Sequence, residues 1–101
     1  MNRDPAPILE TLEAHQQAIR AFGARRLGLF GSWARGEAKE TSDLDFLVEF
    51  EPGRKTFDGY MDLKLFLEDL FNRPVDLVIA EGIKPRLREN ILREVVYAAG
   101  F

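Results

Sequence analysis

Apolar residues recur at intervals of three and four along three stretches of the chain, a spacing that predicts helices. The predicted helices cover residues 5–22, 57–71 and about 84–97. Asp4 is a plausible N-cap for the first, with Pro5 at its first helical position. In the last helix, the spacing predicts that Leu87, Ile91 and Val95 face inward.

Shorter apolar runs, bounded by Gly, Pro or polar residues, predict three strands. They cover residues 25–30, 43–50 and 73–80. Residues 32–37 are expected to form one helical turn after the first strand. The resulting order, α–β–(turn)–β–α–β–α, indicates an α/β or α+β fold in which helices pack on a small sheet.

Composition limits the classes of protein to which the chain can belong. Its 101 residues, 46% of them hydrophobic, are expected to form one domain over 1–101 with a core of its own. There is no Cys to form a disulfide or a thiolate metal site, and no apolar leader or membrane-length run. We therefore expect a cytoplasmic protein. The net charge of −3 argues against nucleic-acid binding as its main activity.

Two aspartates interrupt the second apolar strand. Asp43 and Asp45 are separated by one residue, so in a strand they share a face, with Cα atoms roughly 6.5–7 Å apart. Two like charges at that spacing repel each other and raise one pKa unless a cation lies between them. A hard divalent cation such as Mg²⁺ binds carboxylate oxygens and keeps positions open for substrate phosphates.

Asp76 places a third carboxylate in the third predicted strand. If the second and third strands are neighbours, the three carboxylates could hold two metal ions about 3.5–4 Å apart, as in two-metal phosphoryl transfer. The alternative is structural: Asp43 would cap the Ser42 turn, and Asp45 and Asp76 would face solvent. The sequence leaves both interpretations open for each aspartate taken singly.

The pair Gly31-Ser32 follows the first strand and opens the helical turn. Glycine permits close approach of a ligand to the backbone, and free N–H groups with the Ser32 hydroxyl suit a phosphate oxygen. The pair is not a Walker P-loop, since no Gly-Lys-Ser/Thr follows. Arg35 could bind a phosphate or pair with Glu37, and Trp33 is interpreted as a core residue.

The string "GSWARGEAKETSDLDFLV" (31–48) resembles the minimal nucleotidyltransferase (MNT) family of the DNA polymerase beta nucleotidyltransferase superfamily. The resemblance implies a mixed sheet flanked by helices, and a reaction that moves a nucleoside monophosphate from a nucleoside triphosphate to an acceptor. It implies that Gly31 and Ser32 hold phosphates and that Asp43 and Asp45 ligate Mg²⁺. Asp76 would complete the metal site and help to deprotonate the attacking hydroxyl.

Family members paired with a HEPN-domain toxin act as antitoxins that adenylylate a tyrosine of the toxin. The resemblance therefore implies ATP as substrate, two Mg²⁺ ions and a HEPN-domain partner. Two other hypotheses stay open at this point. One is a non-catalytic module that neutralises a toxin by occlusion, and the other is a nucleotidyltransferase acting on a small molecule such as an aminoglycoside.

Overall fold

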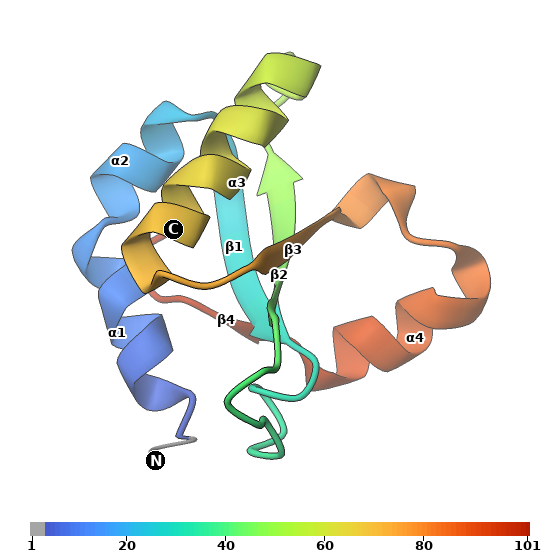
Figure 1. Cartoon of the computed structure of the whole chain (residues 1–101). Helices are drawn as coiled ribbons and strands as arrows, with labels where there is room; N and C mark the ends of the chain where they lie inside the picture. The colour runs from blue at the N-terminus through green and yellow to red at the C-terminus, as the bar shows by residue number, and fades with distance from the viewer. Residues whose placement is uncertain (1–3) are drawn as a thin grey trace.

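A four-stranded sheet with helices on both faces forms the body of the computed structural model, which describes residues 4–101 (Figure 1). Residues 1–3, which contributed to the expectation that the chain has no leader, lie outside the described part. The elements in chain order are α1 (Ala6–Ala14), α2 (Gln16–Ala21), β1 (Ala24–Phe30), β2 (Leu44–Phe50), α3 (Phe57–Phe71), β3 (Val75–Ile79), a 3₁₀ turn η1 (Ala80–Gly82), α4 (Pro85–Glu94) and β4 (Val96–Tyr97).

The strands lie in the order β3-β2-β1-β4. β1 pairs antiparallel with β2 and β4, whereas β2 and β3 run parallel because α3 carries the chain back between them. The mixed sheet flanked by helices is therefore confirmed. In the parallel pair, Leu44 lies opposite Val75, and the register continues through Val48 and Ile79.

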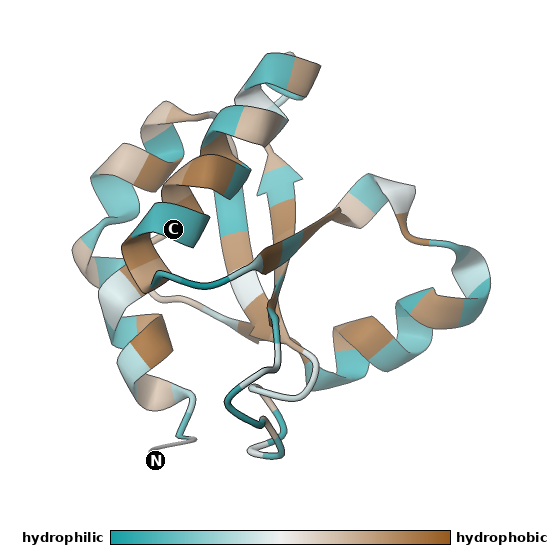
Figure 2. Cartoon of the chain, in the orientation of Figure 1, coloured by the Kyte–Doolittle hydropathy of each residue, from teal (hydrophilic) through white to brown (hydrophobic). Residues whose placement is uncertain are grey.

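The alternation of side chains along β2 divides the interior into two layers. Leu44, Phe46 and Val48 point into the larger core, which α1, α2 and α3 cover. The opposite face carries a smaller apolar cluster built on Phe30, Leu47 and Ile83, against which α4 packs. In Figure 2 hydrophobic bands lie on β3 and along the helices that cover the sheet, whereas the loop between β1 and β2 is largely hydrophilic.

The helix predicted over 5–22 is in fact two helices, α1 and α2, separated at His15. The His15 backbone leaves the helical region (φ −111°, ψ 19°), and its ring Nδ1 lies 2.9 Å from the Thr11 carbonyl oxygen. Apolar spacing continues across this break, which is why the sequence pattern did not reveal it. Asp4 does receive a hydrogen bond from the Ala6 N–H, although Pro5 occupies the cap position.

α3 begins and ends where the sequence predicts. The Thr56 hydroxyl accepts a hydrogen bond from the Gly59 N–H and caps the first turn, and Asn72 adopts the left-handed conformation that ends the helix (φ 51°). On the inner face of α3, the side chains of Leu63 and Leu67 are fully buried. No helix within residues 4–101 combines the length and the apolar character that crossing a membrane requires.

The prediction for the last helix was wrong at its end. α4 stops at Glu94, and residues 96–97 form β4 at the edge of the sheet against β1. The β-branched pair Val95-Val96 favours extended backbone and explains the change. Ile91 and Val95 pack inward as predicted, but Leu87 is 44% exposed.

Candidate nucleotide and metal site

Asp45 and Asp76 lie beside each other near the amino-terminal ends of two parallel strands. They are direct register partners in the β2–β3 pair, so their side chains point to the same face of the sheet across neighbouring strands. This is the face toward α4, as Leu47 two residues after Asp45 belongs to the α4-side cluster. Asp43 lies on the exposed segment immediately before β2. The two strands thus bring two of the predicted carboxylates together, with the third at the edge.

The environment of Asp45 raises its pKa from 3.8 to about 6. Burial is the largest cause, followed by the negative charges of Asp76 and Asp43. The Arg35 guanidinium acts in the opposite direction, while Glu94 adds to the increase. Asp45 is therefore a carboxylate that is costly to ionise until a cation compensates its charge.

Gly31 brings the backbone after β1 directly against the Asp45 carboxylate. Its φ is +77°, and a Cβ built there would collide with the carboxylate oxygen of Asp45. Glycine is therefore required both for the turn and for the close approach. The Arg35 N–H donates to the Gly31 carbonyl at 3.1 Å, and the Glu37 N–H to the Ser32 carbonyl at 2.9 Å. These bonds close a turn over the segment where the sequence predicted one.

Glu94 also contacts the Gly31 turn, although no role was predicted for it from the sequence. One of its carboxylate oxygens accepts a hydrogen bond from the Gly31 N–H at 3.0 Å. The other lies 3.0 Å from the Arg35 guanidinium, which also pairs with Glu37 at 3.0 Å. The alternating charges of α4 read as a solvated face, so this contact was missed. The one available signal is its position, immediately before the β-branched Val95-Val96 pair.

The segment leading to Asp43 is held by Arg73, which lies between α3 and β3. Arg73 donates to the carbonyl oxygens of Ser42 at 2.9 Å and Glu40 at 3.2 Å. Its guanidinium also lies 5.0 Å from the centre of the Trp33 ring, which is buried in the core as expected. Arg73, packed against Trp33, thus fixes the backbone of the segment that precedes Asp43.

The carboxylates suit a hard cation that is also bound by substrate. Their donors are all oxygen, and Mg²⁺ commonly uses one or two carboxylates together with phosphate oxygens and water. Across residues 4–101, no group of three or more Asp, Glu, His or Cys is arranged to hold a metal ion. Asp45 and Asp76, with Asp43 just before β2, are the oxygen donors that such a cation would use at this place.

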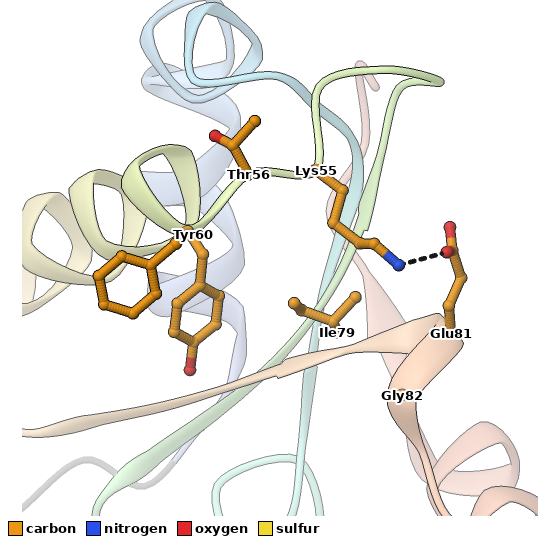
Figure 3. A pocket seen from close by; sticks show the side chains of 7 residues that line it. Lys55, Thr56, Tyr60, Ile79, Glu81 and Gly82 are labelled. Atoms are coloured by element: carbon orange, nitrogen blue, oxygen red, sulfur yellow. Dashed lines mark hydrogen bonds and ion pairs between the residues drawn. The ribbon is translucent and has the colours of Figure 1, made fainter.

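A cavity of about 350 Å³ lies at the other end of the parallel strands, beside the 3₁₀ turn (Figure 3). Tyr60 and Ile79 form its floor, and the Lys55–Glu81 ion pair at 2.9 Å closes one side. Ile79 is three residues beyond Asp76, roughly 10 Å along the strand, and points to the opposite face. This cavity is therefore separate from the carboxylates.

Comparison with known proteins shows the family of the chain. A family profile described as "Nucleotidyltransferase domain" matches residues 12–98. The chain is 45% identical to the protein adenylyltransferase MntA of Thermococcus cleftensis over 91 residues, covering 89% of this chain and 91% of that relative. A solved structure of a candidate minimal nucleotidyltransferase aligns with a TM-score of 0.71 at 50% identity, covering 87% of this chain and 93% of the other.

More distant structures share the fold. The complex of tri-AMPylated Shewanella oneidensis HEPN toxin with its MNT antitoxin aligns with a TM-score of 0.65 at 18% identity, covering 92% of this chain and 73% of the matched chain. With the profile spanning most of the sequence and a relative at 45% identity, the chain belongs to the nucleotidyltransferase domain family, as a minimal nucleotidyltransferase.

Proposed function

We propose that this nucleotidyltransferase moves AMP from ATP to a hydroxyl group of a partner protein and releases pyrophosphate. The observation that carries the proposal is the pairing of Asp45 with Asp76 directly beside the Gly31 turn. The carboxylates of Asp45 and Asp76 thereby lie next to the backbone of Gly31, which packs closely against Asp45. The protein adenylyltransferase name of the 45% identical relative supports AMP as the transferred group and protein as the acceptor.

The residues of the site divide the work. In this proposal Gly31 and Ser32 bind nucleotide phosphates, and Arg35 contributes positive charge to them. Asp43, Asp45 and Asp76 ligate Mg²⁺, for which the sequence suggests two ions. Bound Mg²⁺ neutralises phosphate charge during transfer.

Asp76 has a second role in the proposal. Its carboxylate is exposed, whereas Asp45 is half-buried. Asp76 can therefore be reached by an incoming hydroxyl and accept its proton as the new phosphate ester bond forms. Geometry of this kind, with the base within reach of the proton it removes, is the first requirement of general base catalysis.

A protein delivers the acceptor in this proposal, and we propose that it is a HEPN-domain toxin modified on tyrosine. Asp43 and Asp76 are exposed and Asp45 is half-buried, whereas Ile79, in the cavity of Figure 3, faces the opposite side of the sheet. Within residues 4–101, none of these carboxylates lines that cavity, which favours an acceptor presented by a protein over a small molecule held in it. The structurally similar MNT antitoxin is bound to an AMPylated HEPN toxin, which supports this class of partner. ATP use fits a cytoplasmic reaction.

The test is a transfer assay with the purified protein, the HEPN-domain protein from the same source, Mg²⁺ and ATP. Intact mass spectrometry should show the partner heavier by whole AMP units, and EDTA should abolish the change. Asp45→Asn and Asp76→Asn should abolish it also, whereas Asp69→Asn, exposed on α3, should not. Transfer that persists in both site variants would refute the mechanism. Toxin neutralisation without any transfer would instead indicate occlusion.

A further inference from the structure

We propose that Glu94 is an internal competitor of the nucleotide phosphates and that it sets nucleotide affinity by holding Arg35. The proposal rests on the nucleotide-binding role proposed above. It makes Glu94 a positioning residue, because it acts through the groups that would bind phosphate. Nucleotide binding would then exchange one anion, the Glu94 carboxylate, for another.

The geometry comes from the two oxygens of one carboxylate. Oε1 accepts from the Gly31 N–H and Oε2 pairs with Arg35, each at 3.0 Å. A backbone N–H at a glycine turn and a guanidinium are the donors that recognise phosphate in proteins. Glu94 therefore occupies the Gly31 N–H and the Arg35 guanidinium, two donors that the sequence analysis proposed for nucleotide phosphates. The Glu94 side chain is 26% exposed and the Arg35 side chain 44%, so the ion pair is partly open to water, whereas the hydrogen bond from the Gly31 N–H is partly buried.

The charges around the turn favour the same conclusion. Glu94 adds to the field that Asp43 and Asp76 impose on Asp45, and Arg35 is the cation that opposes them. An incoming triphosphate would meet the carboxylates of Asp43, Asp45, Asp76 and Glu94, and a guanidinium that already pairs with both Glu94 and Glu37. Removing the Glu94 charge would lower that repulsion and release part of Arg35 for the phosphates.

The contact can be neutralised without dislodging α4. Ile91 and Val95 hold the end of this helix against Phe30 and Leu47, and β4 follows in the sheet. In Glu94→Gln the amide oxygen can still accept the hydrogen bond from the Gly31 N–H, while the negative charge that pairs with Arg35 is lost. A purely structural role of Glu94 would weaken nucleotide binding in this variant, whereas competition would strengthen it.

The experiment measures binding of a non-hydrolysable ATP analogue with Mg²⁺ by calorimetry. Glu94→Gln should bind the analogue about three- to tenfold more tightly than the unchanged protein, the size expected for one partly screened charge. Glu89→Gln is the matched control, since Glu89 pairs with Arg93 on the same helix and makes no contact with the turn. Its affinity should not change.

A double-mutant cycle locates the effect. In an Arg35→Met background, Glu94→Gln should tighten binding much less, because the competed cation is gone. Circular dichroism verifies folding, and Glu94→Ala provides a second charge-free variant with the same expected sign. Unchanged or weaker binding by the folded charge-free variants would overturn the inference.

The outcomes separate this inference from the proposed function. If the unchanged protein binds the analogue and neither charge-free variant binds more tightly, only the role of Glu94 fails. If neither the unchanged protein nor the variants bind, both proposals fail. Binding that is measurable only in the charge-free variants supports Glu94 as the block.

Discussion

Asp45 and Asp76 are direct partners across the parallel pair β2–β3, on the face of the sheet toward α4. Like charges placed opposite each other on neighbouring strands destabilise a sheet. The chain keeps this pair at a point where a glycine turn also closes on Asp45. The cost in stability is understandable if a cation and a nucleotide use the pair.

Asp45→Asn should stabilise the protein in a pH-dependent way. The pKa of Asp45 is about 6 in the folded protein and 3.8 ordinarily, so the folded state binds the proton more strongly. As the pH rises from about 4 to about 6, the free energy of unfolding of the unchanged protein should therefore fall relative to that of the variant. This loss of stability is complete at a pH above the pKa of Asp45 in the folded protein, and it is absent at a pH below the ordinary pKa of aspartate. Because Asp45 is only half-buried, we expect a gain of about 1 kcal/mol at pH 7.5.

Urea unfolding of both proteins at pH 4 and pH 7.5, without divalent cations, measures this difference. Asp69→Asn is the control and should show no comparable pH dependence. If the difference in the free energy of unfolding between the two proteins were the same at both pH values, ionisation of Asp45 would not cost stability.

Gly31→Ala should destabilise the protein by about 3 kcal/mol, from a left-handed backbone together with a collision with Asp45. Gly36→Ala is a matched control, because Gly36 has a similar φ of +72° but no atom within 4 Å of a Cβ. It should lose only about 1 kcal/mol. Equal losses in denaturant titrations would mean that the approach to Asp45 does not matter.

Arg73→Met should reduce AMP transfer by about tenfold, because the segment carrying Asp43 loses two hydrogen bonds that fix its position. Lys64→Met on α3, which forms no ion pair or hydrogen bond within residues 4–101, is the control. Steady-state kinetics would measure kcat for both. An unaltered kcat in Arg73→Met would show that this anchor has no part in the reaction.

Leu67→Ala should lower the free energy of unfolding by about 3 kcal/mol, since Leu67 is fully buried in the core between α3 and the sheet. Leu65→Ala removes the same atoms from a side chain that is 56% exposed and should change stability by less than about 0.5 kcal/mol. Similar losses in urea titrations would contradict the packing described for α3.

Local patterns predicted much of the fold. α3 was predicted with its observed limits because the apolar spacing is helical over that whole range, and the structure adds a Thr56 cap and a left-handed Asn72 at its two ends. The break at His15 could not be predicted, since the apolar spacing of α1 continues into α2. The strand at 96–97 was missed because two residues carry too little pattern, and only pairing with β1 defines them.

The candidate site was predictable where residues are close in sequence and less so elsewhere. Asp43, Asp45 and the Gly31 turn stand within one motif, and Asp76 followed from an apolar strand. Glu94 lies 63 residues beyond Gly31, and its contact depends on how α4 folds back over the sheet. No spacing within a helix can reveal such a contact.

The most direct test of the central claim is a crystal structure of the protein with Mg²⁺ and a non-hydrolysable ATP analogue. Our account predicts that carboxylate oxygens of Asp45 and Asp76 ligate the metal while the phosphates lie against the Gly31-Ser32 turn. Nucleotide bound elsewhere, or a metal that contacts neither aspartate, would contradict it.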